Sequence, residues 1–505
     1  MSATPPPGRT AAHRRLGVPA VAFMIVAASA PLTVIAGGST SAFSVTHVVG
    51  IPFGYIVLAV FLAVFAVGYA AMSRYVTDAG AFYSYIAQGL GRPAGVGSSI
   101  LALISYNAMQ IGVYGMFGFQ VSTLIEAKTG WASPWWVWVL VCIAIVALMG
   151  VNRVDLSAKI LGVLVALEFV VVIVFDVAAF FNPAEGTVTA SPITPSTLFV
   201  PGVGAVLAFG IAAFMGFESA AIYGEESKDP KRTIPRATFL AVAVIGIFYA
   251  LSSWALALAV GPGKILDPNG ITADEAGPPL FFNFVAAHLG TLWVDLMSVL
   301  FITSLFASLV SFHNAVARYA FSLGREGVLP SAVGRVRRHS GAPWVGSVTQ
   351  TVVAVLVILG FVFGESGWDP NNGPYPVITL FTWLTNLGAF GLVLLMALVS
   401  LAVIGFFRRD RRDAGLWSRV VAPVLSFVAL GYVWVLILMN WDVLLGQTES
   451  TPTTFLLPAV LLVPAVLAVF WALWLRRARP DVYRRIGHGA DAPAAVHLGE
   501  ETVGV

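Results

Sequence analysis

The chain alternates between long apolar stretches and short polar segments, and the apolar stretches number twelve between residues 17 and 475. Each is close to the ~20 residues that a helix needs to cross about 30 Å of hydrocarbon, and none shows the short apolar and polar alternation of a membrane barrel strand. The pattern predicts an all-α polytopic membrane protein with twelve transmembrane helices. The predicted spans are 17–46, 51–73, 95–124, 134–151, 157–181, 197–223, 236–260, 291–322, 344–363, 375–405, 419–440 and 454–475.

The composition excludes a soluble globular protein. Hydrophobic residues make up 58% of the 505 residues and charged residues only 10%. A water-facing surface on a chain of this length needs roughly a quarter of its residues charged. The outer surface of the helices is therefore expected to face lipid.

The basic residues divide very unequally between the two sets of loops. Of the 28 Lys and Arg residues, only Lys128 and Lys264 fall on one side, and all others fall in the loops and tails of the other side. Positive charge is retained in the cytoplasm during insertion, so both termini are predicted to be cytoplasmic in the plasma membrane. The basic loops could also contact anionic membrane lipid.

The beginning of the chain has a second interpretation. Arg14 and Arg15, the apolar run and Ala28-Ser29-Ala30 together resemble a secretory signal with its cleavage site. The apolar run, however, continues through Pro31 to Ala36 without a polar residue. Removing it would leave an odd number of spans and would place the basic residues on inconsistent sides. We therefore expect it to be the first span.

Two of the spans carry residues that interrupt helices. Span one contains Ala30-Pro31-Leu32-Thr33 followed by Gly37-Gly38-Ser39, and span six contains Gly210 and Gly216. Proline removes a backbone donor and glycine removes stiffness, so both helices are predicted to open. Because five spans separate them, they cross the membrane in opposite directions, which is typical of an inverted-repeat transporter with its site between the broken helices. For span one alone, close helix packing is an alternative explanation.

Three motifs carry a resemblance to a known family. They are Phe214-Met215-Gly216-Phe217-Glu218-Ser219 with 224–235 after it, Phe312-His313-Asn314-Ala315-Val316-Ala317-Arg318 with 324–330 after it, and Gly80-Ala81-Phe82-Tyr83-Ser84-Tyr85. Together with the twelve spans they resemble the amino acid, polyamine and organocation permeases. The resemblance covers residues 15 to 476.

The resemblance implies two inverted repeats of five spans each, residues 15–181 and 197–405, followed by two peripheral spans in 419–476. The tails, 1–14 and 477–505, are rich in Pro, Ala and Gly and are predicted to be disordered and cytoplasmic. The family also implies alternating access, a substrate near the bilayer midplane, and coupling to a proton, a sodium ion or an exchanged solute.

The substrate site is expected between the interrupted helices. In the implied arrangement the backbone from Ala30 to Thr33 would meet a carboxylate and the backbone from Ala212 to Met215 an amine, with side chains from spans three and ten shaping the pocket. The predicted substrate-binding residues are Ala30, Pro31, Leu32, Thr33, Ala212, Ala213, Phe214, Met215, Gly216, Tyr106, Asn107, Gln110 and Trp383.

Two departures from the family pattern put the usual α-amino acid pose in doubt. Ala212 stands where many relatives have a bulky aromatic residue that acts as a lid. Ala-Pro-Leu-Thr at 30–33 stands in place of the usual Gly-Ser-Gly. Both changes could indicate a larger or differently shaped substrate.

Glu168 is the main candidate for coupling. It lies near the middle of span five, and it aligns with a position where some proton-coupled relatives carry a lysine in place of a sodium ion. A charged side chain at the membrane centre costs at least ~2.5 kcal/mol, so an acid there could bind a proton or a cation. We expect it between spans one, five and eight, near Ser308 or Ser311. The alternative is a neutral carboxyl in a structural hydrogen bond.

Two further groups are candidates for gating. Glu218 directly follows the break in span six, where a half-helix N-terminus would favour its carboxylate, and a purely structural cap is an equal alternative. Arg318 could close an inner gate through a salt bridge with Glu225 or Glu226. Ordinary solvated helix ends are the alternative for these three residues.

The sequence therefore predicts a secondary active transporter for an amino acid or a related amine, coupled to a proton or sodium ion. The alternative within transport is a polyamine or ethanolamine-type cation, with Glu168 or Glu218 as its counter-ion. A membrane sensor would need an output domain, yet the longest cytoplasmic loop has only about twenty residues. The solute, the coupling ion, symport or exchange, and the oligomeric state stay open.

Enzymatic activity is not expected. The chain has no H-E-x-x-H, no G-x-S-x-G and no phosphate-binding G-x-x-x-x-G-K-[ST] motif, and its seven His residues are scattered. Cys142 is the only cysteine, which excludes an internal disulfide or a cysteine-based metal site. We expect no cofactor, no metal and no nucleic-acid partner; the expected partners are the solute, the coupling ion and membrane lipid.

Overall fold

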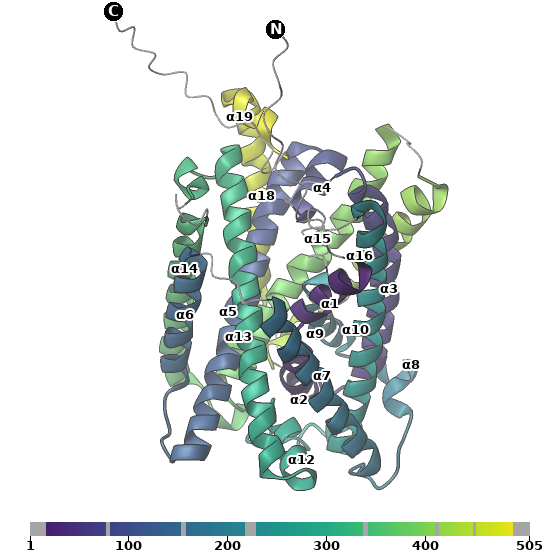
Figure 1. Ribbon diagram of the computed structural model, residues 1–505, viewed down its shortest axis with the longest axis vertical. Helices are drawn as coiled ribbons and strands as arrows, with labels where there is room; N and C mark the ends of the chain where they lie inside the picture. The colour runs from purple at the N-terminus through teal and green to yellow at the C-terminus, as the bar shows by residue number, and fades with distance from the viewer. Residues whose placement is uncertain are drawn as a thin grey trace, which may run out of the picture.

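The computed structural model describes residues 17–76, 81–152, 158–217, 229–336, 342–409, 414–447 and 451–487. Across these ranges the chain forms one bundle of helices without a β-strand (Figure 1). Ten of the described helices are long and apolar enough to cross a membrane. Two interrupted segments stand at the positions of predicted spans one and six. The prediction of an all-α membrane fold is confirmed.

The continuous helices lie where the apolar stretches predict them, and several extend beyond the predicted ends. The π-helix η8 (Pro376–Phe381) leads into α15, and the π-helix η9 (Trp417–Val421) leads into α16. The spanning helices are α3 (Ile51–Ser73), α5 (Arg92–Thr129), α6 (Trp135–Asn152), α7 (Ala158–Phe181), α10 (Pro230–Val260), α13 (Thr291–Glu326), α14 (Trp344–Gly364), α15 (Thr382–Arg409), α16 (Ala422–Met439) and α18 (Pro452–Ala478).

The first span is broken where the sequence places Pro31. Helix α1 (Val18–Ala28) stops, Ser29 and Ala30 leave the helical path, and helix resumes at Pro31 through the π-helix η2 (Thr33–Ser39) and α2 (Thr40–Thr46). Ala30 has a φ of 47°, in the left-handed region. Proline suits the first position of a helix because the missing N–H has no partner there. Gly37 and Gly38 lie inside η2, so the first span is interrupted before Pro31 and not at the predicted glycine pair.

The sixth span is broken at Gly216. Helix α9 (Val203–Phe214) ends, and Gly216 has a φ of 107°, which L-residues with a side chain rarely adopt. The predicted span 197–223 is wrong at its start, because α8 (Pro195–Leu198) is a separate short helix and Gly202, with a φ of 94°, turns the chain into α9. Residues 218–228 lie outside the described residues.

The helices divide into a buried centre and a lipid-facing periphery. In the apolar 18-residue stretch of each spanning helix, 72% of the residues are buried in α5 and 78% in α15 with its preceding η8. The buried share is only 28% in α6, α14 and α18. The peripheral helices expose large apolar side chains such as Leu148, Leu356 and Phe470. Such a surface would aggregate in water and is stable against lipid tails.

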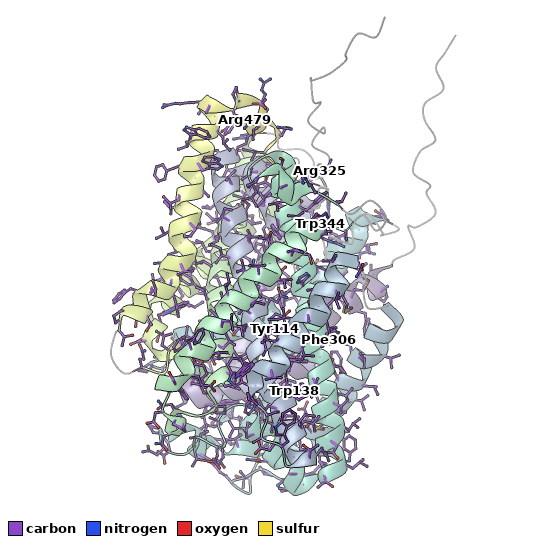
Figure 2. The ribbon with its side chains drawn as sticks, turned by 90° about the vertical axis from the view of Figure 1, so that its left-hand side faces the viewer. Tyr114, Trp138, Phe306, Arg325, Trp344 and Arg479 are labelled. Atoms are coloured by element: carbon purple, nitrogen blue, oxygen red, sulfur yellow. The ribbon has the colours of Figure 1, made fainter. Side chains whose placement is uncertain are left out.

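The two ends of the bundle differ in charge. One end carries α4 (Ala81–Gly89) and α19 (Pro480–Arg485), and is called the α4 face; the other carries α8 and α12 (Pro279–His288), and is called the α12 face (Figure 1). Arg325 and Arg479 lie towards the α4 face (Figure 2). The two lysines at the α12 face are ion-paired, with Nζ–carboxylate distances of 2.6 Å for Lys128–Asp295 and 2.7 Å for Lys264–Glu275.

The beginning of the predicted disordered tail, 477–505, is helical instead. Helix α18 continues to Ala478 and α19 follows directly. Val482 in α19 and Ile486, which directly follows the helix, are buried at the α4 face. The backbone N–H of Gly487 donates to the Tyr83 hydroxyl at 2.7 Å, and that hydroxyl donates to the buried Glu326 carboxylate. This apolar pair docks the segment, which composition alone did not indicate.

Candidate functional site

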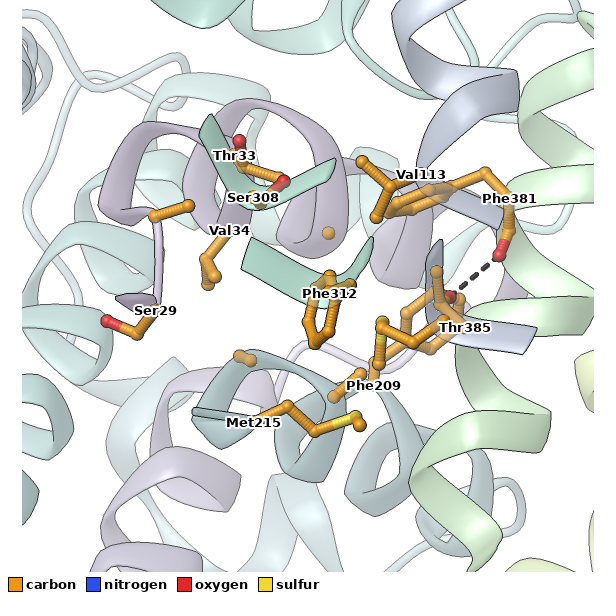
Figure 3. Close-up of a pocket in the computed structure, with 15 residues that line it drawn as sticks. Ser29, Thr33, Val34, Val113, Phe209, Met215, Ser308, Phe312, Phe381 and Thr385 are labelled. Atoms are coloured by element: carbon orange, nitrogen blue, oxygen red, sulfur yellow. Dashed lines mark hydrogen bonds between the residues drawn. The ribbon is translucent and has the colours of Figure 1, made fainter. Parts of the chain in front are cut away.

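A small cavity lies between the two interrupted helices, in the middle of the bundle (Figure 3). The centres of water-sized spheres can occupy about 50 Å³ of it. Residues from both interruptions, from α5 and α13, and from the junction of η8 with α15 surround it. The lining residues are Ser29, Ala30, Thr33, Val34, Gly38, Met109, Val113, Phe209, Ala212, Ala213, Met215, Ser308, Phe312, Phe381 and Thr385.

The cavity lining carries no charged side chain and is mostly apolar. Its polar side chains are four hydroxyls, from Ser29, Thr33, Ser308 and Thr385. Three of them donate to a backbone carbonyl of the preceding turn: Thr385 to Phe381 at 2.7 Å (Figure 3), Ser308 to Leu305 at 2.8 Å and Ser29 to Val26 at 2.7 Å. The side chains thus suit an apolar solute group, and the polar recognition has to come from the interrupted backbone.

Three helix ends meet at this cavity. Helix α1 ends at Ala28 and α9 ends at Phe214, so two C-termini with their partial negative charge lie beside it. The third end is the N-terminus of the helix that starts at Pro31. The short loop between α1 and the helix that starts at Pro31 is held by Tyr249, whose hydroxyl lies 3.0 Å from both the carbonyl oxygen and the Oγ of Ser29.

Glu168 is the acid nearest to this N-terminus. Its Oε2 accepts the backbone N–H of Leu32 at 3.2 Å and the hydroxyl of Ser304 at 2.9 Å. Thr33 donates to the Ser304 Oγ at 2.9 Å, and Thr33 itself lines the cavity. The carboxylate is almost completely buried, with 2% of the residue exposed. Two hydroxyls therefore connect the cavity to Glu168, which ties α7 and α13 to the interrupted first span.

The hydrogen-bond partner of Glu168 differs from the predicted one. The sequence predicts a position near Ser308 or Ser311, whereas Ser304 makes the contact. Ser308 lies one turn further along the same face of α13 and lines the cavity, and Ser311 is exposed on another face. The error is one helical turn, because the depth at which α13 crosses α7 depends on packing that the sequence does not display.

The predicted residues of α5 lie beside the cavity lining rather than in it. Tyr106 packs on Phe312 and Tyr319, with ring centroids 6.4 and 5.6 Å apart. Asn107 donates to the carbonyl of Leu103 in its own helix, and Gln110 donates to the Tyr114 hydroxyl at 3.3 Å. The helix instead presents Met109 and Val113, an i, i+4 pair that sequence spacing alone could not distinguish from the rest of the apolar surface.

Several other predicted residues also lie outside the lining. Trp383 packs on Phe361 with centroids 6.1 Å apart, and Phe381 and Thr385 on either side of it line the cavity. Phe214 packs between Tyr55 and Tyr249. Pro31, Leu32 and Gly216 shape the backbone at the interruptions but do not line the cavity, whereas Ala30, Thr33, Ala212, Ala213 and Met215 do.

The predicted gate is only partly visible. Glu218, Glu225 and Glu226 lie outside the described residues. Arg318 is exposed on α13. His313, nine residues after Ser304 on α13, is buried and lies 2.7 Å from the Ser347 hydroxyl, as a core histidine would. In the described ranges no three His, Cys, Asp or Glu residues group in a way that could hold a metal.

The chain matches known proteins over most of its length. A family model described as "Amino acid permease" matches residues 16–471. The low-affinity putrescine importer PlaP of Escherichia coli K12 is 24% identical over 86% of this chain and 90% of its own. The branched-chain amino acid permease BcaP of Lactococcus lactis is 23% identical over 76% of this chain and 80% of its own.

The fold is shared with solved transporter structures, of which MhsT is an example. The crystal structure of MhsT in complex with L-phenylalanine superposes with a TM-score of 0.55, covering 83% of this chain and 98% of that one. The sequence identity is 15%, so this likeness concerns the fold alone.

Proposed function

Because the chain belongs to the amino acid permease family, we propose that this membrane transporter carries an amino acid or a related amine across the plasma membrane by alternating access. The observation that carries the proposal is that both interrupted helices border one cavity in the middle of the bundle. Opened backbone at that depth is tolerated where it lines a cavity, and there its polar groups become available to a solute. Membrane insertion with both termini in the cytoplasm belongs to the same proposal.

The lining suggests a solute with an apolar part. Phe209, Phe312 and Phe381 bring aromatic rings to the cavity, and Met109 and Met215 add flexible apolar side chains. Ala212 lines the cavity at the position where many relatives have a bulky aromatic residue that acts as a lid. An aliphatic solute group would bury its surface here, at roughly 25 cal/mol per Å².

A second candidate solute is an amine without a carboxylate. It is favoured because the protein itself already occupies part of the helix N-terminus at Pro31, where a solute carboxylate would bind. Proline has no N–H, and the N–H of Leu32 is already donated to Glu168. A solute carboxylate at this helix end would compete with Glu168 for the remaining donors and would lie close to a like charge. An ammonium group would instead meet the negative ends of α1 and α9.

We also propose that Glu168 binds the coupling proton. The acid joins α7 to the first span through Leu32 and to α13 through Ser304, so movement of the first span would change its surroundings. Loss of the two donors would leave the carboxylate unpaired inside the membrane, which favours proton uptake. A proton that binds one conformation better than the other supplies the differential affinity that coupling requires.

A thermal-shift screen of the purified protein tests the solute class. L-leucine and L-asparagine represent amino acids, and putrescine and isoamylamine represent amines. A solute that binds only the folded state stabilises it by about 2.7 kcal/mol when the solute concentration is 100 times the Kd. Stabilisation by the amino acids supports the first candidate, stabilisation by isoamylamine or putrescine alone supports the second, and no shift with any amino acid or amine contradicts the proposal.

The Glu168→Gln variant tests coupling. Glutamine keeps one carbonyl oxygen for Leu32 or Ser304 but cannot take up a proton. We expect solute binding to persist and the pH dependence of uptake into proteoliposomes to disappear. The matched control is Asp295→Asn, an acid at the α12 face that is half exposed and paired with Lys128. Unchanged pH dependence in Glu168→Gln would show that the carboxyl is structural.

A further inference from the structure

A second buried acid lies on the same face of α7 as Glu168. Glu168, Val172 and Asp176 are spaced four residues apart and are 2%, 0% and 5% exposed. This spacing places them in one row along the helix, with the two carboxyls about 12 Å apart along its axis. Asp176 is therefore a candidate for a role connected with Glu168.

The hydrogen bonds of Asp176 are incomplete. Its Oδ2 accepts the hydroxyl of Ser252 on α10 at 2.7 Å. Its Oδ1 is buried and has no hydrogen-bond partner among the described residues. Buried polar atoms are almost always paired, and an unpaired one calls for a functional explanation. An acid with one free oxygen is ready to accept a proton.

Two hydroxyls on α10, those of Ser252 and Tyr249, lie on the side of the helix that faces these two acids. Helices α7 and α10 descend side by side in the same direction, with Phe169 against Phe248 at 4.4 Å and Phe180 against Trp254 at 5.0 Å between ring centroids. Ser252, which holds Asp176, lies one turn beyond Tyr249. Tyr249 contacts Ser29 at the interruption and is close enough to Glu168 to interact with its charge. The α10 helix thus places the Ser252 hydroxyl at Asp176 and the Tyr249 hydroxyl near Glu168, one turn apart.

Asp176 lies on the α12 side of Glu168. The neighbouring Phe175 packs against Phe281 and Phe284 of α12, with ring centroids 4.3 and 5.4 Å apart. Glu168, two turns earlier, lies at the level of the interrupted first span. A proton that enters from the α12 face would reach Asp176 before Glu168 (Figure 1).

Among the described residues, the titratable groups that face this part of α7 from the elements packed against it do not offer Asp176 a counter-charge. Tyr249 on α10 is bonded to Ser29, His288 on α12 is exposed, and Asp295 at the start of α13 is paired with Lys128. Further along α13, His313 contacts Ser347 and Glu326 accepts the Tyr83 hydroxyl. Helix α1 carries no titratable side chain. A hard cation would need several oxygen ligands, and Ser252 supplies one, so the geometry suits a proton.

We propose that Asp176 is a second proton-binding carboxyl, through which the coupling proton passes from the α12 face to Glu168. The inference rests on the proposed coupling role of Glu168. A proton from water at the α12 face forms an O–H bond at Oδ1 of the Asp176 carboxylate. The bond breaks again when the proton moves along the hydroxyls towards the Glu168 carboxylate, so Asp176 returns to its charged form and no other reactant is needed.

Infrared difference spectroscopy of the purified full-length protein tests proton binding without any solute. A protonated carboxyl shows a C=O stretching band that shifts when the proton is replaced by deuterium. We expect such a band to rise as the pH is lowered and to be missing from Asp176→Asn, while Asp295→Asn retains it. A spectrum of Asp176→Asn identical to that of the unchanged protein over the whole pH range would overturn the proposal.

Transport into proteoliposomes tests the path, with L-leucine and putrescine as probes. We expect Asp176→Asn to retain binding of the transported probe and to lose the response of uptake to the pH at the α12 face. Ser252→Ala removes the hydroxyl that donates to Asp176 but leaves the acid in place, and it should alter the pH profile of uptake. This variant replaces Asp176→Asn in the test if Asp176→Asn does not fold. Full pH dependence in both variants contradicts the path. If the unchanged protein shows no pH dependence, the coupling role of Glu168 fails as well, and the infrared result alone decides whether Asp176 binds a proton.

Discussion

Pro31 and Glu168 show how single residues define this site. Pro31 starts the helix after the interruption and removes one N–H from its end, and Glu168 accepts the next one, from Leu32. The helix end that could bind an anion from outside is therefore largely satisfied by the protein itself. The same two residues position the first span against α7 and α13, so recognition and coupling share their contacts.

At the residue scale, we expect Gly216→Leu to abolish transport while the protein still inserts and folds. The φ of 107° at Gly216 is strained for any residue with a side chain, at about 1–3 kcal/mol, and relief of that strain would change the end of α9 beside the cavity. The measurement is uptake per molecule of protein in proteoliposomes.

The matched control for this prediction is Gly360→Leu. Gly360 lies on an exposed face of α14, and a Cβ atom added there would meet no atom within 4 Å. Uptake by this control should stay normal. Normal uptake by Gly216→Leu as well would show that the conformation at residue 216 serves packing only.

A second residue-scale prediction concerns the Lys264–Glu275 ion pair at the α12 face. Partial burial raises the pKa of Glu275, but the Lys264 ammonium and the N–H and hydroxyl of Thr272 outweigh this and lower it below its ordinary value of 4.5. A lowered pKa stabilises the fold above the ordinary value, and this contribution is lost as the pH falls through the lowered pKa. Lys264→Gln should lower the free energy of unfolding at pH 7 by up to about 1 kcal/mol, which is measured as a slightly lower melting temperature. Below pH ~4 the loss of stability should be smaller.

The reference for this pair is Lys128→Gln, whose ion pair with Asp295 is more exposed, at 51% and 41% of the side chains. We expect a smaller effect there, because solvent screens exposed pairs. A Lys264→Gln effect that does not change between pH 7 and pH 4 would contradict the assignment to Glu275.

At the element scale, close approach of helix backbones holds the α4 face together. Gly89 at the end of α4 and Gly405 in α15 lie against one another, and a methyl group at Gly89 would overlap the Ala402 carbonyl. Glycine is needed here for its lack of a side chain, since both helices contribute backbone atoms to the contact. The same end is closed by α19 with its buried Val482 and by Ile486 directly after it, which is also buried.

We therefore expect Gly89→Ala to separate α4 from α15 and to destabilise the protein by about 1–3 kcal/mol, the usual cost of overpacking. Gly431→Ala is the matched control, since Gly431 lies in α16 with no atom within 4 Å of an added methyl group. Its melting temperature should be unchanged or slightly higher, because alanine is the better helix former. Equal melting temperatures for the two variants in detergent would contradict this account of the contact.

At the scale of the whole molecule, the charge difference between the two ends predicts the orientation in the membrane. The α4 face carries the basic ends of α13, α15 and α18, and the lysines of the α12 face are neutralised by acids. A strong excess of basic residues is retained in the cytoplasm. The α12 face should therefore be extracellular, which is also the side from which we propose that protons reach Asp176.

Single cysteines test this orientation, because Cys142 is buried and is the only native thiol. In a Cys142→Ala background, Asn269→Cys lies in the exposed loop before α12 and Ser331→Cys on the exposed turn after α13. An impermeant maleimide should label the first in intact cells and the second only after permeabilisation. The reverse labelling would invert the orientation and the proposed direction of proton entry.

Features that depend on local chemistry could be predicted from the amino-acid sequence alone. Runs of apolar residues set the spans because a helix must cross a fixed thickness of hydrocarbon. Pro31 and Gly216 determined where spans one and six open, because each acts on its own backbone. The mid-depth position of Glu168 could likewise be read from its distance along span five, since helix rise per residue is constant.

Tertiary structure decided which side of each helix faces the cavity. Met109 and Val113 line it in place of Tyr106, Asn107 and Gln110, and the partner of Glu168 is Ser304, which is 136 residues away in sequence. In a helix surrounded by lipid and other apolar helices, hydrophobicity is similar on every face and does not reveal the rotation about the axis. That rotation, and the depth at which helices cross, follow from side-chain packing between distant segments, which brings Glu168, Ser304 and Thr33 together at the interrupted helix.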